Sequence, residues 1–74
     1  MKTTYKIQSN MNENNILFHQ IVKDDKPLCG FTEEHPFNYV TERKYLLEVV
    51  EEQARVLKNN LAIKSIEKKV EVEE

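Results

Sequence analysis

Residues 41–59 read TERKYLLEVVEEQARVLKN and carry the most regular apolar pattern of this 74-residue chain. The apolar residues recur at three- and four-residue spacing and continue just beyond the segment: Leu46, Val50, Ala54, Leu57 and Leu61. Charged side chains occupy the opposite side of the same helical projection. A period near 3.6 residues is typical of a helix that packs one face against a core. The pattern therefore predicts one helix from about Thr41 to Asn59.

Polar residues at both ends of this segment indicate where the helix begins and ends. Asn38 or Thr41 can cap the N-terminus by accepting a hydrogen bond from a backbone amide, and Glu42 favours the positive end of the helix dipole. Asn59 and Asn60 tolerate the left-handed backbone that often ends a helix. We therefore expect an N-cap at Asn38 or Thr41 and a left-handed C-cap at Asn59 or Asn60.

The N-terminal part of the chain alternates with the period of a β-strand. Thr3, Tyr5 and Ile7 alternate with polar residues, which places them on one face of an extended segment. The asparagine-rich stretch that follows, residues 9–15, tolerates left-handed backbone and should reverse the chain direction. We therefore expect a first strand that leads into a hairpin.

The next apolar run, residues 16–22, has the composition of a second strand. Two apolar sets alternate in it, one on each face: Ile16, Phe18 and Val22, then Leu17 and Ile21. Its β-branched and aromatic residues favour a strand that needs cover on both faces. Because Leu17 and Ile21 are also four positions apart, a short amphipathic helix over residues 12–23 is an alternative.

A turn and a short third strand are expected after this run. Residues 23–27 combine aspartates with Pro27, which lacks a backbone donor, and this composition is typical of a turn. Residues 28–32 form a short strand in this interpretation, in which Gly30 indicates a bulge or a close backbone approach. Residues 33–38 connect this strand to the helix, because a residue before a proline avoids helical backbone.

The last segment, residues 61–74, returns to a period of two. One alternating face contains Lys68 among apolar residues: Ile66, Val70 and Val72. This pattern predicts a final strand. A seven-residue recurrence of Val49, Val56, Ile63 and Val70 leaves a longer helix with a coiled-coil seam as the alternative.

Together the elements predict an α+β fold of the small two-layer sandwich type. An antiparallel β-hairpin or meander packs on one long helix, and a C-terminal strand completes the sheet, in the order β-β-(β)-α-β. Residues 1–74 form a single domain in this interpretation, because a chain of this length has room for one core.

Composition indicates the compartment and excludes broad classes of partner. Eleven Lys and Arg against thirteen Asp and Glu give a net charge of −2, so no overall field draws the chain to nucleic acid or to an anionic membrane. Cys29 is the only cysteine, which excludes an internal disulfide and favours a reducing compartment. No apolar stretch resembles a secretion signal or a membrane span. We therefore expect a cytoplasmic protein with no membrane partner.

Few residues suggest chemistry. Cys29 and His35 lie six positions apart with two glutamates between them, so a metal- or thiol-dependent enzyme built around Cys29 and His35 is one alternative function. Zinc sites usually show two ligand pairs, and the chain has neither a glycine-rich phosphate loop nor a nucleophile elbow. We therefore predict no catalytic residue, no metal site and no cofactor.

A small nucleic-acid-associated regulator is the other alternative. Its phosphate contacts would come from the basic residues Arg43, Lys44, Lys64, Lys68 and Lys69. Glutamates lie close to the two adjacent basic pairs and weaken their attraction for phosphate. We therefore do not expect nucleic acid to be the partner.

The predicted helix carries more apolar surface than one sheet covers. Beside the arc that faces the sheet, three residues form a second stripe: Tyr45, Val49 and Val56. The strand at residues 16–22 makes the same point independently, because a single helix covers only one face of a sheet. An isologous homodimer would bury this surplus. The alternative is that the loop at residues 28–38 folds back over it with Phe31 and Phe37.

These observations favour a non-enzymatic protein-interaction module, meaning an adaptor, inhibitor or regulator of a protein that the sequence does not identify. We expect it to act as a homodimer. The predicted interface consists of helix residues with two aromatic residues beside them: Tyr45, Val49, Glu52 and Val56, then Phe37 and Tyr39. Aromatic anchors are favoured in protein interfaces.

Overall fold

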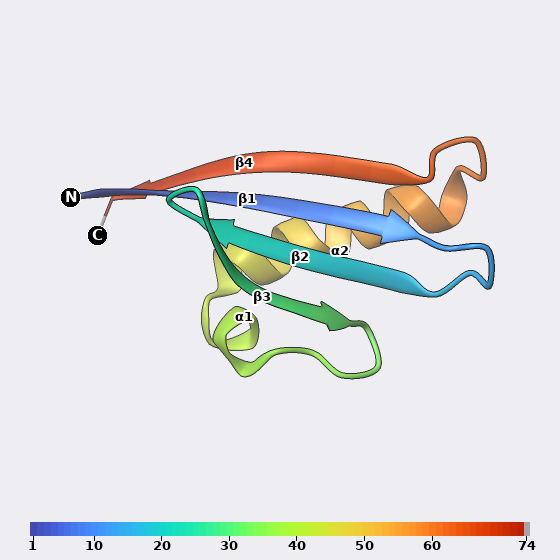
Figure 1. Ribbon diagram of the computed structural model, residues 1–74, viewed down its shortest axis with the longest axis horizontal. Helices are drawn as coiled ribbons and strands as arrows, with labels where there is room; N and C mark the ends of the chain where they lie inside the picture. The colour runs from blue at the N-terminus through green and yellow to red at the C-terminus, as the bar shows by residue number, and fades with distance from the viewer. Residues whose placement is uncertain (74) are drawn as a thin grey trace.

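The computed structural model describes residues 1–73 and contains one four-stranded antiparallel sheet with a long helix across one face (Figure 1). In chain order the elements are β1 (Lys2–Met11), β2 (Leu17–Lys23), β3 (Lys26–Thr32), α1 (Asn38–Glu42), α2 (Lys44–Asn59) and β4 (Ser65–Glu73). The strand order across the sheet is β3-β2-β1-β4, so the chain returns from α2 to pair its last strand with its first. The predicted α+β architecture is confirmed.

Strands β1 and β2 form a hairpin whose alternate residues face the helix. The buried residues of the two strands are Thr3, Tyr5, Ile7 and Ser9 in β1, and Leu17, His19 and Ile21 in β2. The period of two therefore predicted the buried face of β1 correctly. The alternative of a short helix over residues 12–23 is wrong, because residues 17–23 pair with residues 5–11.

Both hairpin turns use residues that tolerate unusual backbone. Asp24 and Asp25 have φ values of 49° and 66°, which suits a two-residue turn that follows the twist of the sheet. In the first turn the side-chain oxygen of Asn12 accepts hydrogen bonds from the amides of Asn14 and Ile16, each at 2.9 Å. The predicted chain reversal in the asparagine-rich stretch is confirmed.

Strand β3 is longer than predicted and contains a bulge. Its pairing with β2 shifts between Ile21 and Val22, which leaves Leu28 as the extra residue. Gly30 lies under the Phe18 ring, where an added Cβ would be 2.7 Å from the ring Cζ. Of the two explanations predicted for Gly30, the close approach is correct, and the bulge lies at Leu28 instead.

The predicted single helix is interrupted at Arg43, whose φ of −106° and ψ of 91° are extended. Val40 of α1 and Leu46 of α2 are both buried in the same core. In a continuous helix their side chains would point about 120° apart, because each residue turns the helix by about 100°. The break allows both residues to face the core, so the prediction of an uninterrupted helix over residues 41–59 is wrong.

The predicted helix caps are wrong as well. The residues before α1 and α2 are Phe37 and Arg43, and among the described residues neither forms a side-chain cap hydrogen bond. Asn38 and Thr41 lie inside α1 instead. Asn60 follows α2 with a φ of −134°, which is extended and not left-handed. Packing against the sheet, and not capping, therefore determines where these helices begin and end.

Strand β4 forms one edge of the sheet. Residues 65–73 pair with residues 2–10 of β1 without a register shift. Its half-buried residues face the helix side: Ile66, Val70 and Val72. The predicted final strand is confirmed, and the alternative of a coiled-coil helix is wrong. Glu74, the last residue of the predicted strand, lies outside the described residues.

The core lies between the sheet and the helices and has two parts. The larger part contains Tyr5, Ile7, Ile21, Phe31, Val40, Leu46, Val49 and Val50. The smaller part lies toward the C-terminal end of α2 and contains Leu17, Ala54 and Leu57. Burial of one large apolar side chain contributes about 1.5–3 kcal/mol, so the larger part dominates the stability of the fold.

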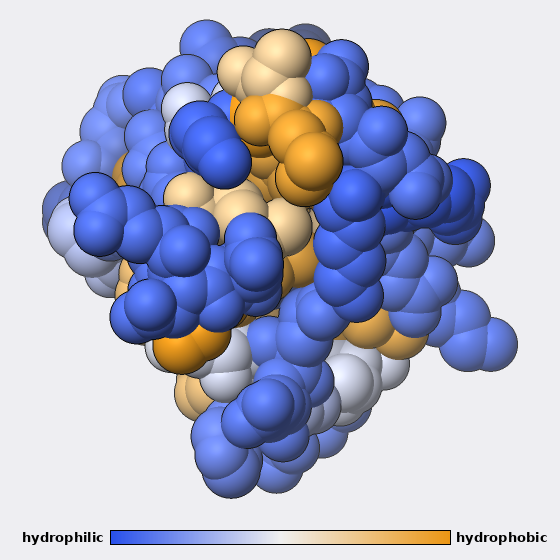
Figure 2. All heavy atoms as spheres, turned by 90° about the vertical axis from the view of Figure 1, so that its right-hand side faces the viewer, coloured by the Kyte–Doolittle hydropathy of each residue, from blue (hydrophilic) through white to orange (hydrophobic). Residues whose placement is uncertain are grey.

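Apolar side chains reach the surface at the end of the molecule that carries the β1–β2 turn. Figure 2 looks onto this end and shows apolar side chains between polar ones. Leu61 is 74% exposed and Ile16 is 49% exposed. The prediction that Leu61 continues the buried face of the helix is therefore wrong, because α2 ends at Asn59.

Candidate protein-interaction surface

The predicted interface residues on α2 divide between the core and the surface. Val49 is 8% exposed and belongs to the core, and the Tyr45 ring packs 6.2 Å from the ring of Tyr5. Glu52 is exposed, Val56 is half-buried, and both line a groove beside β4. The accessible part of the predicted patch is therefore its C-terminal half.

The two aromatic residues of the predicted interface lie near the N-terminal end of α2. The rings of Phe37 and Tyr39 stack with their centroids 6.3 Å apart. The Tyr39 hydroxyl lies 2.8 Å from the Tyr5 hydroxyl, and the Arg43 guanidinium lies 3.8 Å from the centroid of the Tyr39 ring. These contacts attach α1 to the sheet. Phe37 and Tyr39 therefore do not join the groove that Val56 lines.

The tyrosine cluster has a structural role. Burial, followed by hydrogen bonds to Tyr39 and Tyr45, raises the pKa of Tyr5 far above its usual value. The Tyr5 phenol therefore stays neutral at physiological pH and donates or accepts a hydrogen bond inside the core. This arrangement holds α1 and α2 against β1.

A groove of about 160 Å³ lies between α2 and β4. Its lining combines three residues from each element: Glu52, Gln53 and Val56 of α2, and Ile66, Glu67 and Lys68 of β4. The helix packs more over β1 than over β4, which leaves the helix side of β4 half open. Glu52 and Val56 of the helix half of this groove were predicted from the sequence. The β4 half was not predicted, although the alternation of Ile66, Lys68 and Val70 was the available signal.

The outer side of β4 presents backbone groups that β1 does not use. The Met11 amide donates to the Lys64 carbonyl at 2.8 Å, which makes this a hydrogen-bonded pair of the antiparallel β1–β4 ladder. Such pairs recur at every second residue. In β4 the even-numbered residues 66–72 therefore bond to β1, and the odd-numbered residues 65–73 direct their amides and carbonyls outward.

The β1–β2 ladder confirms this alternation independently. The Asn12 amide donates to the Ile16 carbonyl at 3.0 Å, and the Asp24 amide donates to the Thr4 carbonyl at 2.8 Å. Even-numbered residues of β1 therefore bond to β2, and its odd-numbered residues bond to β4. Within residues 1–73 no strand lies beyond β4, so its outward row forms an open sheet edge.

The face of the sheet opposite α2 carries charges of both signs. Lys2 contacts Glu71 at 2.9 Å, and Lys6 contacts Glu67 at 3.5 Å. The hydrogen bond from Lys2 lowers the pKa of Glu71, which stays ionised. Exposed ion pairs of this kind contribute little stability, because water and salt screen them. They hold the β4 side chains of this face in a defined charge pattern.

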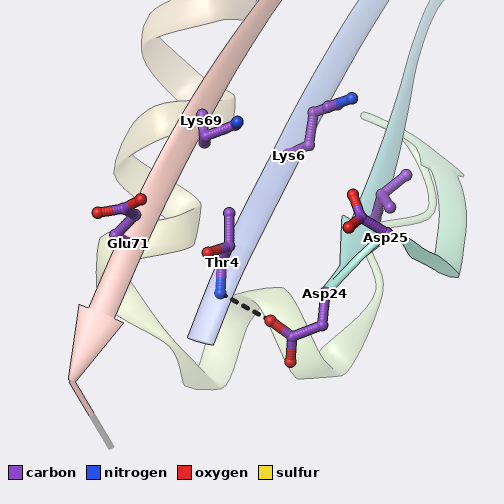
Figure 3. Close-up of a pocket in the computed structure, with 7 residues that line it drawn as sticks. Thr4, Lys6, Asp24, Asp25, Lys69 and Glu71 are labelled. Carbon is purple, nitrogen blue, oxygen red and sulfur yellow. Dashed lines mark hydrogen bonds between the residues drawn. The ribbon is translucent and has the colours of Figure 1, made fainter. Parts of the chain in front are cut away.

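A cavity of about 250 Å³ lies on the same face (Figure 3). Its lining residues are Thr4, Lys6, Val22, Asp24, Asp25, Lys69 and Glu71. One Asp24 carboxylate oxygen accepts a hydrogen bond from the Thr4 amide at 3.0 Å, as drawn in Figure 3. Carboxylates and ammonium groups are mixed in this cavity, so it lacks the concentrated positive charge that binds a phosphate.

A buried polar network joins the sheet to α2. The Ser9 hydroxyl donates to the Gln53 side-chain oxygen at 2.8 Å and lies 2.6 Å from His19 Nδ1. Because the single Ser9 proton goes to Gln53, Nδ1 of His19 carries a proton and donates to Ser9. The Gln53 amide in turn donates to the Ile7 carbonyl at 3.2 Å. The network therefore fixes α2 over β1 and β2.

This network does not have the geometry of a nucleophilic triad. Ser9 and His19 are both fully buried, and the Ser9 proton points away from the imidazole. Burial lowers the pKa of His19, with Glu33 acting in the opposite direction, so the imidazole is neutral. Among the described residues, Nε2 of His19 has no hydrogen-bond partner. We therefore assign Ser9 and His19 a structural role.

Cys29 and His35 show no sign of a shared site. Cys29 is half-buried against the core, and burial raises the pKa of its thiol, which disfavours the reactive thiolate. His35 is exposed in the loop after β3. Within residues 1–73 no group of three or more His, Cys, Asp or Glu side chains could hold a metal ion.

The basic residues proposed for phosphate contacts do not form one surface. Lys68 and Lys69 are adjacent in β4 and therefore point to opposite faces of the sheet. Arg43 lies on the Tyr39 ring before α2, and Lys64 lies at the far end of the same helix, before β4. A continuous track for a nucleic-acid backbone is not visible among the described residues.

Comparison with known proteins gives no significant match, whether the chain is compared with family models, with curated proteins or with solved structures. Neither helix in residues 1–73 has the length and hydropathy needed to cross a bilayer. Function therefore has to be inferred from the residues and their arrangement.

Proposed function

We propose that this chain is a non-enzymatic protein-interaction module that accepts an extended segment of a partner protein along β4. One observation carries the proposal: the outward amides and carbonyls of β4 have no further strand beside them within residues 1–73. A partner strand would bond to this row by strand addition. The main-chain hydrogen bonds would supply affinity, and side chains would supply specificity.

The groove beside β4 supplies that specificity. Side chains of an added strand alternate between the two faces of the sheet, so every second one would lie on the helix side. There it would meet the apolar surface of Val56 and Ile66 and the ammonium group of Lys68. We therefore expect a partner that brings an apolar side chain and a carboxylate to this face of the sheet.

The role of such a module is that of an adaptor, inhibitor or regulator, and we place it in the cytoplasm. The single free thiol of Cys29 supports this placement, because unpaired cysteines are typical of reducing compartments. The two alternatives have less support. The thiol of Cys29 is held in its unreactive form, and Lys68 and Lys69 point to opposite faces of the sheet.

The test compares two substitutions at one outward position. Lys69→Pro removes an outward amide without touching the bonds to β1, as proline does on edge strands. Lys69→Thr removes the same charge and keeps the amide. Immobilised wild type and Lys69→Thr are expected to capture the same protein from native lysate, and Lys69→Pro is expected to lose it.

Circular dichroism checks that both variants remain folded. Val56→Lys provides a second comparison, because it changes the groove and leaves the backbone of β4 intact. Equal capture by the wild type, Lys69→Pro and Val56→Lys would show that β4 and its groove are not the binding surface.

A further inference from the structure

The outer strand β4 is complementary to itself. Its sequence from residue 65 to residue 73 is SIEKKVEVE, in which two central lysines are flanked on both sides by glutamates and by three apolar residues. From this pattern we infer that the strand added to β4 is β4 of a second copy, so that two sheets join into one antiparallel sheet of eight strands. This inference rests on the proposed function and names its partner.

Two-fold symmetry limits the number of pairings. Two identical antiparallel strands are related by an axis perpendicular to the sheet, and residues that face each other must lie on the same face. The axis can therefore pass beside Lys68, Lys69 or Val70 near the middle of the strand. Each choice places different charges opposite each other.

An axis at Lys69 is unfavourable on the open face. It places Lys69 opposite its own copy and Glu67 opposite Glu71 of the second copy, twice by symmetry. Like charges directly opposite each other in an antiparallel pair are destabilising. This arrangement is therefore excluded.

A pairing around an axis at Val70 is favourable at its centre and unfavourable at its ends. Lys69 would face Glu71 of the second copy, but Glu67 would face Glu73. The overlap within β4 would cover residues 67–73. Lys68 would lie against Val72 of the second copy, without an acidic residue opposite it.

An axis at Lys68 gives the most complementary pairing. On the open face Glu67 lies opposite Lys69 of the second copy, and this ion pair occurs twice. On the helix side Ile66 lies opposite Val70 of the second copy, also twice. Within β4 the overlap covers residues 65–71, the same length as with the axis at Val70, so the charge pairing decides between the two axes.

The two Lys68 side chains meet at this axis, and the groove explains how they are accommodated. Glu52 of the adjacent helix lines the same groove as Lys68, so each copy brings one carboxylate to the two ammonium groups. Lysine on an edge strand discourages indiscriminate pairing. Here Lys68 would reject strands that do not bring an acidic residue with them.

The helices support the same arrangement. An axis perpendicular to the sheet places both α2 helices on the same face of the joined sheet. Val56 and Ile66, which are half-buried in one copy, would lie along the junction and become covered. This arrangement uses Glu52 and Val56 of the predicted interface and leaves Val49 in its own core.

A cysteine scan tests the register directly. Lys68→Cys, Lys69→Cys and Val70→Cys are prepared separately in a Cys29→Ser background, so that each chain has one thiol. With the axis at Lys68, the residues 68 of the two copies form a pair without mutual hydrogen bonds, with Cα atoms about 4.5 Å apart. This separation lies in the roughly 4.4–6.8 Å range of disulfides.

Mild oxidation is therefore expected to cross-link Lys68→Cys into dimers, with Lys69→Cys and Val70→Cys remaining largely monomeric. Cross-linking at position 70 alone, or at position 69 alone, overturns the register. Absence of cross-linking at all three positions overturns the pairing of two β4 strands. Gel electrophoresis without reducing agent provides the measurement.

Sedimentation equilibrium separates this inference from the proposed function. The wild type is expected at twice the 8.8 kDa of one chain, and Lys69→Pro at 8.8 kDa. A monomeric wild type overturns the homodimer, and capture that is lost in Lys69→Pro would then still support strand addition by another protein. A dimer that survives Lys69→Pro uses a different surface and overturns the inference. If Lys69→Pro reduces neither the dimer mass nor the capture, both the homodimer and the proposed strand addition are overturned.

Discussion

The two edges of the sheet differ in the features that control strand pairing. At the β3 edge Pro27 has no amide to offer, and Leu28 forms a bulge. The loop after β3 also folds onto this edge, where the His35 amide donates to the Thr32 carbonyl at 3.2 Å. Strand β4 pairs with β1 without a register shift over nine residues and contains no proline.

This difference shows how a small sheet can direct association to one side. Proline, a bulge and a covering loop are the devices by which proteins close an exposed edge, and β3 has all three. On β4 the main device is charge, including Lys68 on the helix side. Charge selects among partners and leaves the backbone available.

The largest expected effect comes from a proline on β4, which closes this edge in the way that Pro27 closes the β3 edge. Lys69→Pro should weaken the dimer at least about a hundredfold, because two outward amides are lost by symmetry and the proline ring occupies their place. Lys69→Thr should keep most of the affinity. Sedimentation equilibrium over a concentration series measures both, and equal affinities for the two variants would contradict the role assigned to the edge.

A charge reversal on β4 should have a smaller effect. Glu67→Lys places lysine opposite Lys69 of the second copy in two pairs and should weaken the dimer about tenfold. The double variant Glu67→Lys/Lys69→Glu should recover it. Glu67→Gln is the control for the lost contact with Lys6. With the axis at Val70, Glu67→Lys would instead strengthen the dimer, because Glu67 then faces Glu73.

A substitution on β3 should leave association unchanged and affect folding. Gly30→Ala brings a Cβ to within 2.7 Å of the Phe18 ring, which has to move. We expect the free energy of unfolding to fall by about 1 kcal/mol, at the lower end of overpacking effects. In a Phe18→Ala background the same substitution should be harmless. Urea titration measures the change, and an altered dimer affinity would contradict the separation of the two edges.

The smallest expected effect concerns the protonation of His19 in the core. Burial lowers the pKa of His19 in the folded state, whereas the unfolded chain has a His pKa of about 6.5. Below that pH the unfolded chain binds the proton more readily, so stability is complete above pH 6.5 and is lost as the pH falls toward the folded pKa. Between pH 7.5 and 5.5 we expect a loss of up to about 1 kcal/mol.

Urea titration of the Lys69→Pro variant measures this change without a contribution from dimerisation. His19→Gln in the same background should show a smaller dependence on pH. If both proteins lose the same stability between pH 7.5 and 5.5, another group is responsible.

The strands were predictable wherever local alternation and burial agree. Thr3, Tyr5 and Ile7 face the core as their period requires, and Ile66, Val70 and Val72 share one face of β4. The helix ends were not predictable from local signals, since Arg43 is no helix breaker by itself. The break there follows from the need to bury Val40 and Leu46 together.

The candidate surface shows the same limit. Glu52 and Val56 were identified from the helix alone, because a helical projection places residues on faces. The projection could not distinguish Val49, which the sheet covers, from Val56, which it leaves half open. The β4 half of the groove depends on which strand lies beside the helix, and strand order is a property of the whole chain.

The sequence by itself determined the element types, the buried faces of β1 and β4 and the turn residues, because these depend on side chains within a few positions of one another. Only the tertiary structure decided the strand order, the break at Arg43 and the position of the open edge. These features depend on contacts between residues far apart in the chain, such as Lys2 with Glu73 in the β1–β4 pair. The free energies of these contacts depend on the whole fold, so no single segment of the sequence specifies them.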